Sequence, residues 1–174
     1  MWHTVMIACM VAMTGVYSMM DETMPTVSAR QAKADGMAQS MAVYRQAVLS
    51  YFEDKPELKK NVDTVAINDL IDGGMLPEWS TLNANPEATI WTNFRDNKGT
   101  IYIYAIARPP VDIVTDVLTL AYNSELVGLF RDGDRTLHSP VHGDTGIKLP
   151  PPGRARIPDG SPVWIALPSK ERKA

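Results

Sequence analysis

The first twenty residues constrain the chain most. Met1–Met20 reads MWHTVMIACMVAMTGVYSMM, and its only ionisable side chains are those of His3, Cys9 and Tyr17. A helix rises about 1.5 Å per residue, so this stretch has the length to cross a hydrocarbon core of about 30 Å. It ends at Asp21 and Glu22, where burial in hydrocarbon becomes costly. We therefore predict a transmembrane anchor.

Two other interpretations of this stretch remain open. A cleaved secretory signal normally begins with basic residues, which are absent here, although Val16-Tyr17-Ser18 resembles a small-residue cleavage site. A buried helix of a soluble protein is also compatible with the composition. The orientation of an anchor is ambiguous, because Arg30, Lys33 and Arg45 follow the stretch and the positive-inside rule would then keep the remainder cytoplasmic.

The totals restrict the rest of the chain. After the anchor about 150 residues remain, enough for one domain with a single core. The net charge is −3, from 17 basic and 20 acidic residues, which argues against a nucleic-acid-binding protein. Cys9 is the only cysteine, so an intramolecular disulfide is excluded. We divide the chain into an anchor (1–20), a linker (21–27), one α+β domain (28–168) and a basic tail (169–174).

The segment after the linker has helical periodicity. We expect Met24-Pro25-Thr26 to break the first helix and Ser28 to cap a second, amphipathic one over 29–52. Its apolar stripe should pack on an antiparallel sheet. The predicted contacts join Met37, Met41, Tyr44 and Val48 of the helix to Ile101, Ile103, Val127, Leu129, Val163 and Ile165 of the sheet.

Alternating apolar residues predict most of the sheet. One hairpin is expected over 88–107 and a second over 125–138, each with a turn containing Asp and Gly. Short helices are predicted at 65–72 and 111–122, an extended edge at 76–79 and a final strand at 161–167. The segment 139–159 is dense in Pro and Gly and should be loop, with at most a short strand at 146–149.

Candidate chemistry is sparse. Asp144-Thr145-Gly146 is the triplet that aspartic proteases use, but catalysis needs two such carboxylates sharing a proton, and a turn explains the triplet equally well. His138 and His142 are four residues apart with Pro140 between them, and no third ligand has convincing spacing, so we predict exposed loop histidines and no metal site. No catalytic residue, cofactor site or phosphate-binding loop is predicted.

Several segments together resemble the PilM family of conjugative-plasmid thin pilus systems. They are the apolar start, MAVYRQAVLSYF (41–52), DGGMLPEW (72–79) and IPDGSPVW (157–164). The resemblance implies a non-enzymatic inner-membrane component of the pilin transport apparatus, with its domain in the periplasm. The layout also resembles pilins, but a prepilin has a basic leader ending in Gly and an early Glu, which Met1–Met20 lacks.

The expected partners are other pilus-assembly proteins and the inner membrane, with a homo-oligomer as a further possibility and no nucleic acid. Small residues spaced for close helix packing, and two loops taken to lie on the side of the domain away from the anchor, Pro109–Asp112 and Pro140–Asp159, are the candidate interfaces. The individual interface candidates are Ala8, Ala12, Gly15, Pro151 and Pro152. The alternatives are a membrane-anchored periplasmic hydrolase using Asp144 or the histidines, and a secreted pilin-like subunit.

Overall fold

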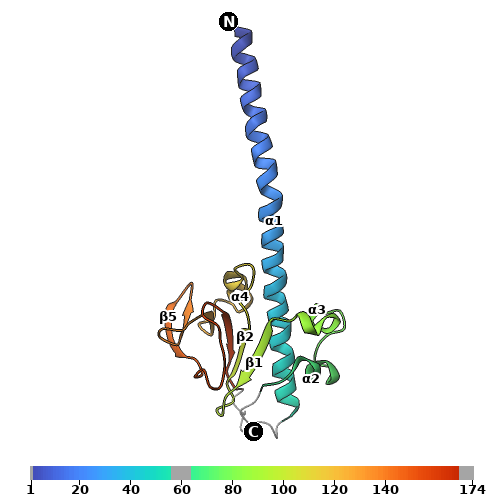
Figure 1. The fold of residues 1–174 in the computed structure, drawn as a ribbon, viewed down its shortest axis with the longest axis vertical. Coiled ribbons are helices and arrows are strands. Elements are labelled where there is room, and N and C mark those ends of the chain that lie inside the picture. Colours follow the sequence, from blue (N-terminus) through green and yellow to red (C-terminus); the bar gives the residue numbers. More distant parts are fainter. Residues whose placement is uncertain (1, 56–63, 169–174) are drawn as a thin grey trace.

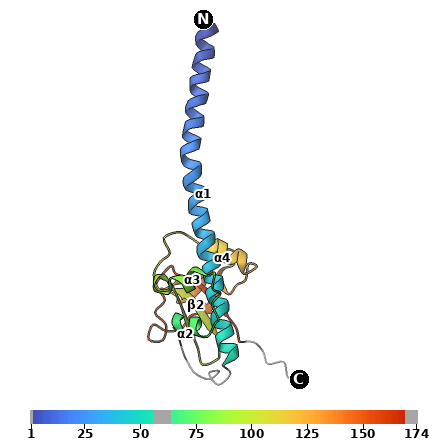
Figure 2. The same cartoon turned by 90° about the vertical axis from the view of Figure 1, so that its right-hand side faces the viewer.

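The fold is built around one long helix. The computed structural model describes residues 2–55 and 64–168, and of residues 2–26 the backbone alone. Helix α1 spans Trp2–Asp54, 53 residues or about 80 Å, and projects far beyond the domain built on its C-terminal half (Figures 1 and 2). The expected helix break at Met24-Pro25-Thr26 is wrong, because α1 continues through it, and Ser28 is therefore not an N-cap.

The continuity of α1 has a simple cause. A proline inside a helix removes one N–H donor and costs about 3 kcal/mol, which the uninterrupted hydrogen bonds before and after it can offset. The linker predicted at 21–27 is thus helical, and the division into anchor and domain stays a prediction. Among the described residues, no helix is long and apolar enough to cross a membrane. The side chains of the predicted anchor lie outside the described residues.

The described chain contains a six-stranded antiparallel sheet in the order β1-β2-β6-β3-β4-β5. Its strands are β1 (Trp91–Arg95), β2 (Ile101–Ala105), β3 (Val127–Arg131), β4 (Thr136–Ser139), β5 (Gly143–Lys148) and β6 (Pro162–Ala166). Both predicted hairpins and the final strand are confirmed, with shorter bounds. The predicted edge at 76–79 is wrong, because this segment forms turns that lead into a short helix.

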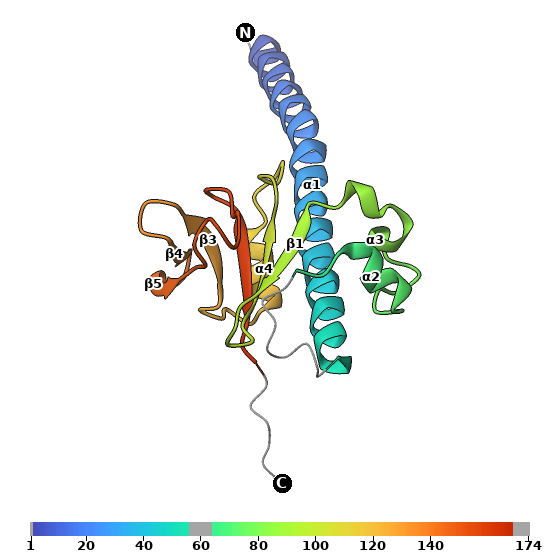
Figure 3. The same cartoon turned by 60° about the horizontal axis from the view of Figure 1, so that its bottom comes forward.

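Within residues 2–55 and 64–168, four short helical elements accompany α1. They are α2 (Ile67–Asp72), α3 (Thr81–Ala84), the 3-10 turn η2 (Pro86–Ala88) and α4 (Val114–Leu120). Helix α4 packs beside α1 over the sheet, and the pair α2 and α3 lies on the other side of α1 from β5 (Figures 1 and 3). We call residues 64–90 the α2–α3 lobe.

The helix face of the sheet forms the larger core. Met41, Tyr44 and Val48 are fully buried there, which confirms the predicted stripe, with Met37 half-buried at its margin. Their partners are Ile101, Ile103, Ala105, Val127, Trp164 and Ala166, with Leu129 at the edge. The predicted partners Val163 and Ile165 are wrong, since both side chains point to the opposite face.

A second core covers that opposite face, where a single core was expected. Tyr102, Tyr104, Val163 and Ile165 line it, because β2 and β6 are buried on both sides. Residues 149–157 fold over it and insert the side chains of Leu149, Ala155 and Ile157. Residues 149–157 are loop, as predicted, but they also cover the second core as a lid.

A buried amide joins three parts of the chain. The Asn93 side chain is fully buried and donates from Nδ2 to the Tyr44 hydroxyl and to the Val65 carbonyl, both at 2.8 Å. Its Oδ1 accepts from the Val65 N–H at 3.0 Å. Asn93 thus satisfies the backbone of the segment that covers the β1 edge, and it connects this edge to α1.

Replacing Asn93 with Ala should destabilise the protein by about 3 kcal/mol, because the Val65 N–H and C=O lose their partners while remaining buried. Urea unfolding of the purified chain, followed by tryptophan fluorescence, measures this loss. Asn68→Ala on the exposed side of α2 is the matched control and should change stability little. Equal losses in the two variants would contradict the bridging role of Asn93.

The same network predicts a pH dependence. Burial raises the pKa of Tyr44 from 10.0 to about 12, since the phenolate is poorly solvated there. The folded-state pKa of Tyr44 lies above its unfolded-state value. The contribution of the protonated Tyr44 to folding stability is therefore complete below pH 10 and is lost as the pH rises towards 12. Tyr44→Phe should flatten that part of the stability curve, measured by urea unfolding at several pH values. An unchanged curve would show that Tyr44 does not contribute.

Candidate interaction surfaces

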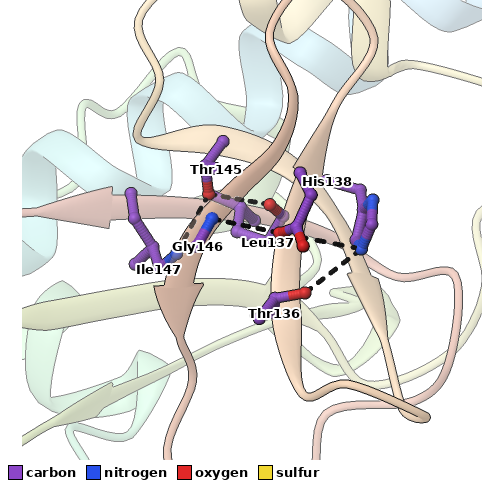
Figure 4. Close-up of polar contacts among 7 residues, drawn as sticks. Thr136, Leu137, His138, Thr145, Gly146 and Ile147 are labelled. Atoms are coloured by element: carbon purple, nitrogen blue, oxygen red, sulfur yellow. Dashed lines mark hydrogen bonds and ion pairs between the residues drawn. The ribbon is translucent and has the colours of Figure 1, made fainter.

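The predicted catalytic triplet lies in the outermost strand of the sheet. Asp144, Thr145 and Gly146 belong to β5. Thr136 pairs with Lys148 and His138 with Asp144, so one residue of β4 lies opposite three of β5 between these pairs. Within this irregularity Gly146 takes a φ of +66°, as is common for glycine in a bulge. The predicted turn is therefore a bulge in an edge strand (Figure 4).

The side chains of the triplet close this bulge. Asp144 Oδ1 accepts from the Gly146 N–H at 3.0 Å, and Thr145 Oγ1 accepts from the Ile147 N–H at 3.3 Å (Figure 4). The Thr145 hydroxyl also donates to the Leu137 carbonyl at 2.7 Å. Two amide groups of the edge are thus occupied by the strand's own side chains, which protects it against pairing with another strand.

The histidines do not form a metal centre with this carboxylate. His138 lies in β4 and is largely buried, with Nε2 3.1 Å from Thr136 Oγ1 and 3.9 Å from Asp144 Oδ1. His142 is exposed, and its Nε2 lies 2.7 Å from the Asn123 carbonyl on the turn after α4. The prediction of two exposed loop histidines is thus wrong for His138, because the strand covers it. In the described residues, no group of three His, Cys, Asp or Glu side chains is placed to hold a metal ion.

The charge state of Asp144 bears on the hydrolase alternative. The Gly146 N–H holds the pKa of this exposed carboxyl below its usual value of 3.8, with His138 as a smaller influence. A general acid needs the opposite shift, as in a carboxyl pair sharing a proton. The geometry around Asp144 therefore suits a structural carboxylate.

The structure describes only some of the predicted interface residues. The side chains of Ala8, Ala12 and Gly15 lie outside the described residues. Pro151 and Pro152 are exposed on the lid over the second core. The loop Pro109–Asp112 leads into α4, which bonds to α1 through Gln31 and Asp116 at 3.2 Å, near the end where α1 leaves the domain (Figure 1). The prediction that this loop lies on the far side is wrong.

The sequence pattern did not predict that Trp79 is exposed. Trp79 stands in the α2–α3 lobe with 78% of its surface exposed, although the other described tryptophans, Trp91 and Trp164, are buried. The segment DGGMLPEW contributed to the family resemblance, and its last four residues were predicted as an extended edge. Its Pro and Glu were clues to an exposed turn, but apolar periodicity cannot reveal which aromatic residue faces solvent.

The role of Thr145 leads to a stability prediction. Thr145→Val keeps the shape but removes both hydrogen bonds, so it should cost about 1 to 2 kcal/mol in urea unfolding and speed amide exchange at Ile147. Thr115→Val, at an exposed position of α4, is the control and should do neither. Unchanged exchange at Ile147 would contradict the closed bulge.

Comparison with known proteins identifies the family. The sequence model named PilM matches residues 7–165. The crystal structure of a protein described as PilM from Escherichia coli B7A has the same fold, with a TM-score of 0.51 and 20% identity over 78% of this chain and 93% of that one. No curated protein matches the sequence significantly. The resemblance found in the sequence is confirmed, and the chain belongs to the PilM family.

Proposed function

We propose that the protein is a non-enzymatic component of the type IV (thin) pilus assembly and pilin transport apparatus, used in conjugation. Met1–Met20 anchors it in the bacterial inner membrane by a single span, and the domain stands in the periplasm. Family membership supports a role in pilus-related processes. The membrane anchor, the periplasmic location and the role in pilin transport are inferred from the sequence and from the shape of the molecule.

The projection of α1 carries the proposal. The helix extends well beyond the domain (Figure 1), residues 27–33 are exposed, and Ala34 is the first of its described residues that is buried. The backbone of this N-terminal part of α1 projects away from the domain (Figure 1), and an apolar stretch placed there requires another apolar environment. A bilayer supplies it, and the exposed helix below the anchor would then hold the domain away from the lipid.

The single cysteine allows a clean test of location. In a Cys9→Ala background we would place one cysteine at Asn97, in the exposed turn of the first hairpin. A membrane-impermeant maleimide should label it once the outer membrane is opened while the inner membrane stays intact. The control is the unmodified chain, whose Cys9 should stay unlabelled because it lies within the bilayer. Labelling of the Asn97 position only after lysis would place the domain in the cytoplasm.

Fractionation tests attachment independently. The chain should remain in the membrane pellet after high-salt and alkaline washing. Recovery of a soluble protein beginning near Met19 would establish the cleaved-signal interpretation instead.

Two alternative functions can be tested directly. A hydrolase would use Asp144 or the histidines, although His138 Nε2 lies 3.9 Å from Asp144 Oδ1, beyond hydrogen-bond distance, and Ala substitution at Asp144, His138 and His142 tests it. An assembly role predicts that mating is largely retained, whereas loss of mating at unchanged protein levels would favour the enzyme. The continuous helix α1 favours a secreted pilin-like subunit, which predicts the chain in sheared pili with a shortened N-terminus.

A further inference from the structure

Trp79 is presented by a rigid turn. The Ser80 N–H donates to the Pro77 carbonyl at 3.0 Å, so Glu78 and Trp79 occupy the tip. Leu76 and Ser80 on either side are buried, and Ser80 Oγ accepts from the Leu82 N–H at 3.2 Å to begin α3. A turn held this way loses little backbone freedom on binding.

The segment that contains Trp79 carries charge of one sign. The segment 64–94 contains four acidic residues and no Lys, Arg or His. All four are exposed, and within the described structure none takes part in an ion pair. We call this set the Trp79 surface: Asp69, Asp72, Glu78, Trp79 and Glu87. An exposed tryptophan on a lobe whose charged side chains are all carboxylates suits a partner that is both apolar and basic.

The lid over the second core has the complementary chemistry. The segment 145–158 contains Lys148, Arg154 and Arg156 and no acidic residue. Arg154 and Arg156 are exposed, as are Pro151 and Pro152. We call residues 150–156 the proline segment.

The proline segment is also held in place. Buried Ala155 secures one end, and the Arg135 guanidinium donates to the Pro150 carbonyl at the other. The Arg154 N–H donates to the Pro151 carbonyl at 2.9 Å, which closes a turn between these ends. Proline rings on a preformed backbone are a usual ligand for exposed aromatic side chains.

The two surfaces cannot meet within one molecule. The α2–α3 lobe and β5, which leads into the proline segment, lie on opposite sides of α1 in two views (Figures 1 and 3). We propose that the Trp79 surface of one copy binds the proline segment of a second copy, with Trp79 against Pro151 and Pro152 and the carboxylates facing Arg154 and Arg156.

The contact is head-to-tail, because the two sides of the interface differ. Such contacts generate closed rings or open filaments according to the rotation between neighbours. The inference does not depend on membrane attachment or on the pilus role, so its test can fail while the proposed function stands.

Crosslinking between differently marked copies tests the pairing. In a Cys9→Ala background, one purified full chain carries Thr81→Cys beside Trp79 and the other carries Gly153→Cys. A short bismaleimide should give dimers when the two are mixed and far fewer with either alone. Replacing Thr81→Cys by Asn97→Cys on the remote hairpin is the control. Equal dimer yield from one variant alone would indicate a symmetric contact and overturn the proposal.

Substitution tests the chemistry of the contact. Trp79→Ala should weaken self-association about 30-fold or more in sedimentation velocity of the full chain in detergent, as expected of an interface anchor. The side chain is exposed, so folding should be unaffected, which circular dichroism checks. Tyr122→Ala, at a tyrosine 94% exposed elsewhere, is the matched control and should have no effect.

Charge reversal provides the rescue. Reversing Asp72 and Glu78 to Arg, or Arg154 and Arg156 to Glu, should each weaken association about fivefold. One chain carrying all four substitutions should regain most of the affinity. A chain that stays monomeric at its highest soluble concentration, or one whose association ignores Trp79→Ala and both reversals, would overturn the proposal.

Discussion

The burial of one face of α1 is the interaction on which the rest of the structure depends. Met41, Tyr44 and Val48 fill the space above the sheet, and α4 and the α2–α3 lobe contact the same helix from other directions. Most of the stability of a helix in a protein comes from the packing of one face rather than from propensity, so the packed half of α1 supports the half that projects. The domain therefore acts as a base that fixes the direction of the exposed helix.

Polar side chains bond the backbone at both edges of the sheet. At β1, buried Asn93 bonds the backbone at Val65, and an added segment covers the edge. At β5, Asp144 and Thr145 bond the strand's own amides across a bulge. Both arrangements reduce the number of backbone groups at the sheet edges that are free to pair with another chain. The triplet that resembles a protease motif is explained by this role.

The sequence predicted the elements better than their environment. The hairpins and the amphipathic helix followed from periodicity, since Ile101 and Ile103 alternate with Tyr102 and Tyr104 on different faces. The face of β6 could not be predicted, because SPVWIAL is apolar in both alternations and only pairing with β2 decides it. The lid over the second core was missed for a related reason, since proline-rich composition does not reveal whether Leu149 and Ile157 are buried.

The geometry of α1 also limits how copies can meet. If its apolar end lies in a membrane, neighbouring copies share one orientation and differ by rotation about the membrane normal and by translation. Side-by-side contact then brings different flanks together, unless the rotation is a half turn. The flanks here are unlike in the required way, with Trp79 and carboxylates on one side and Pro151, Pro152 and two arginines on the other. A fixed direction of α1 thus favours a head-to-tail assembly, because it presents unlike surfaces to each other.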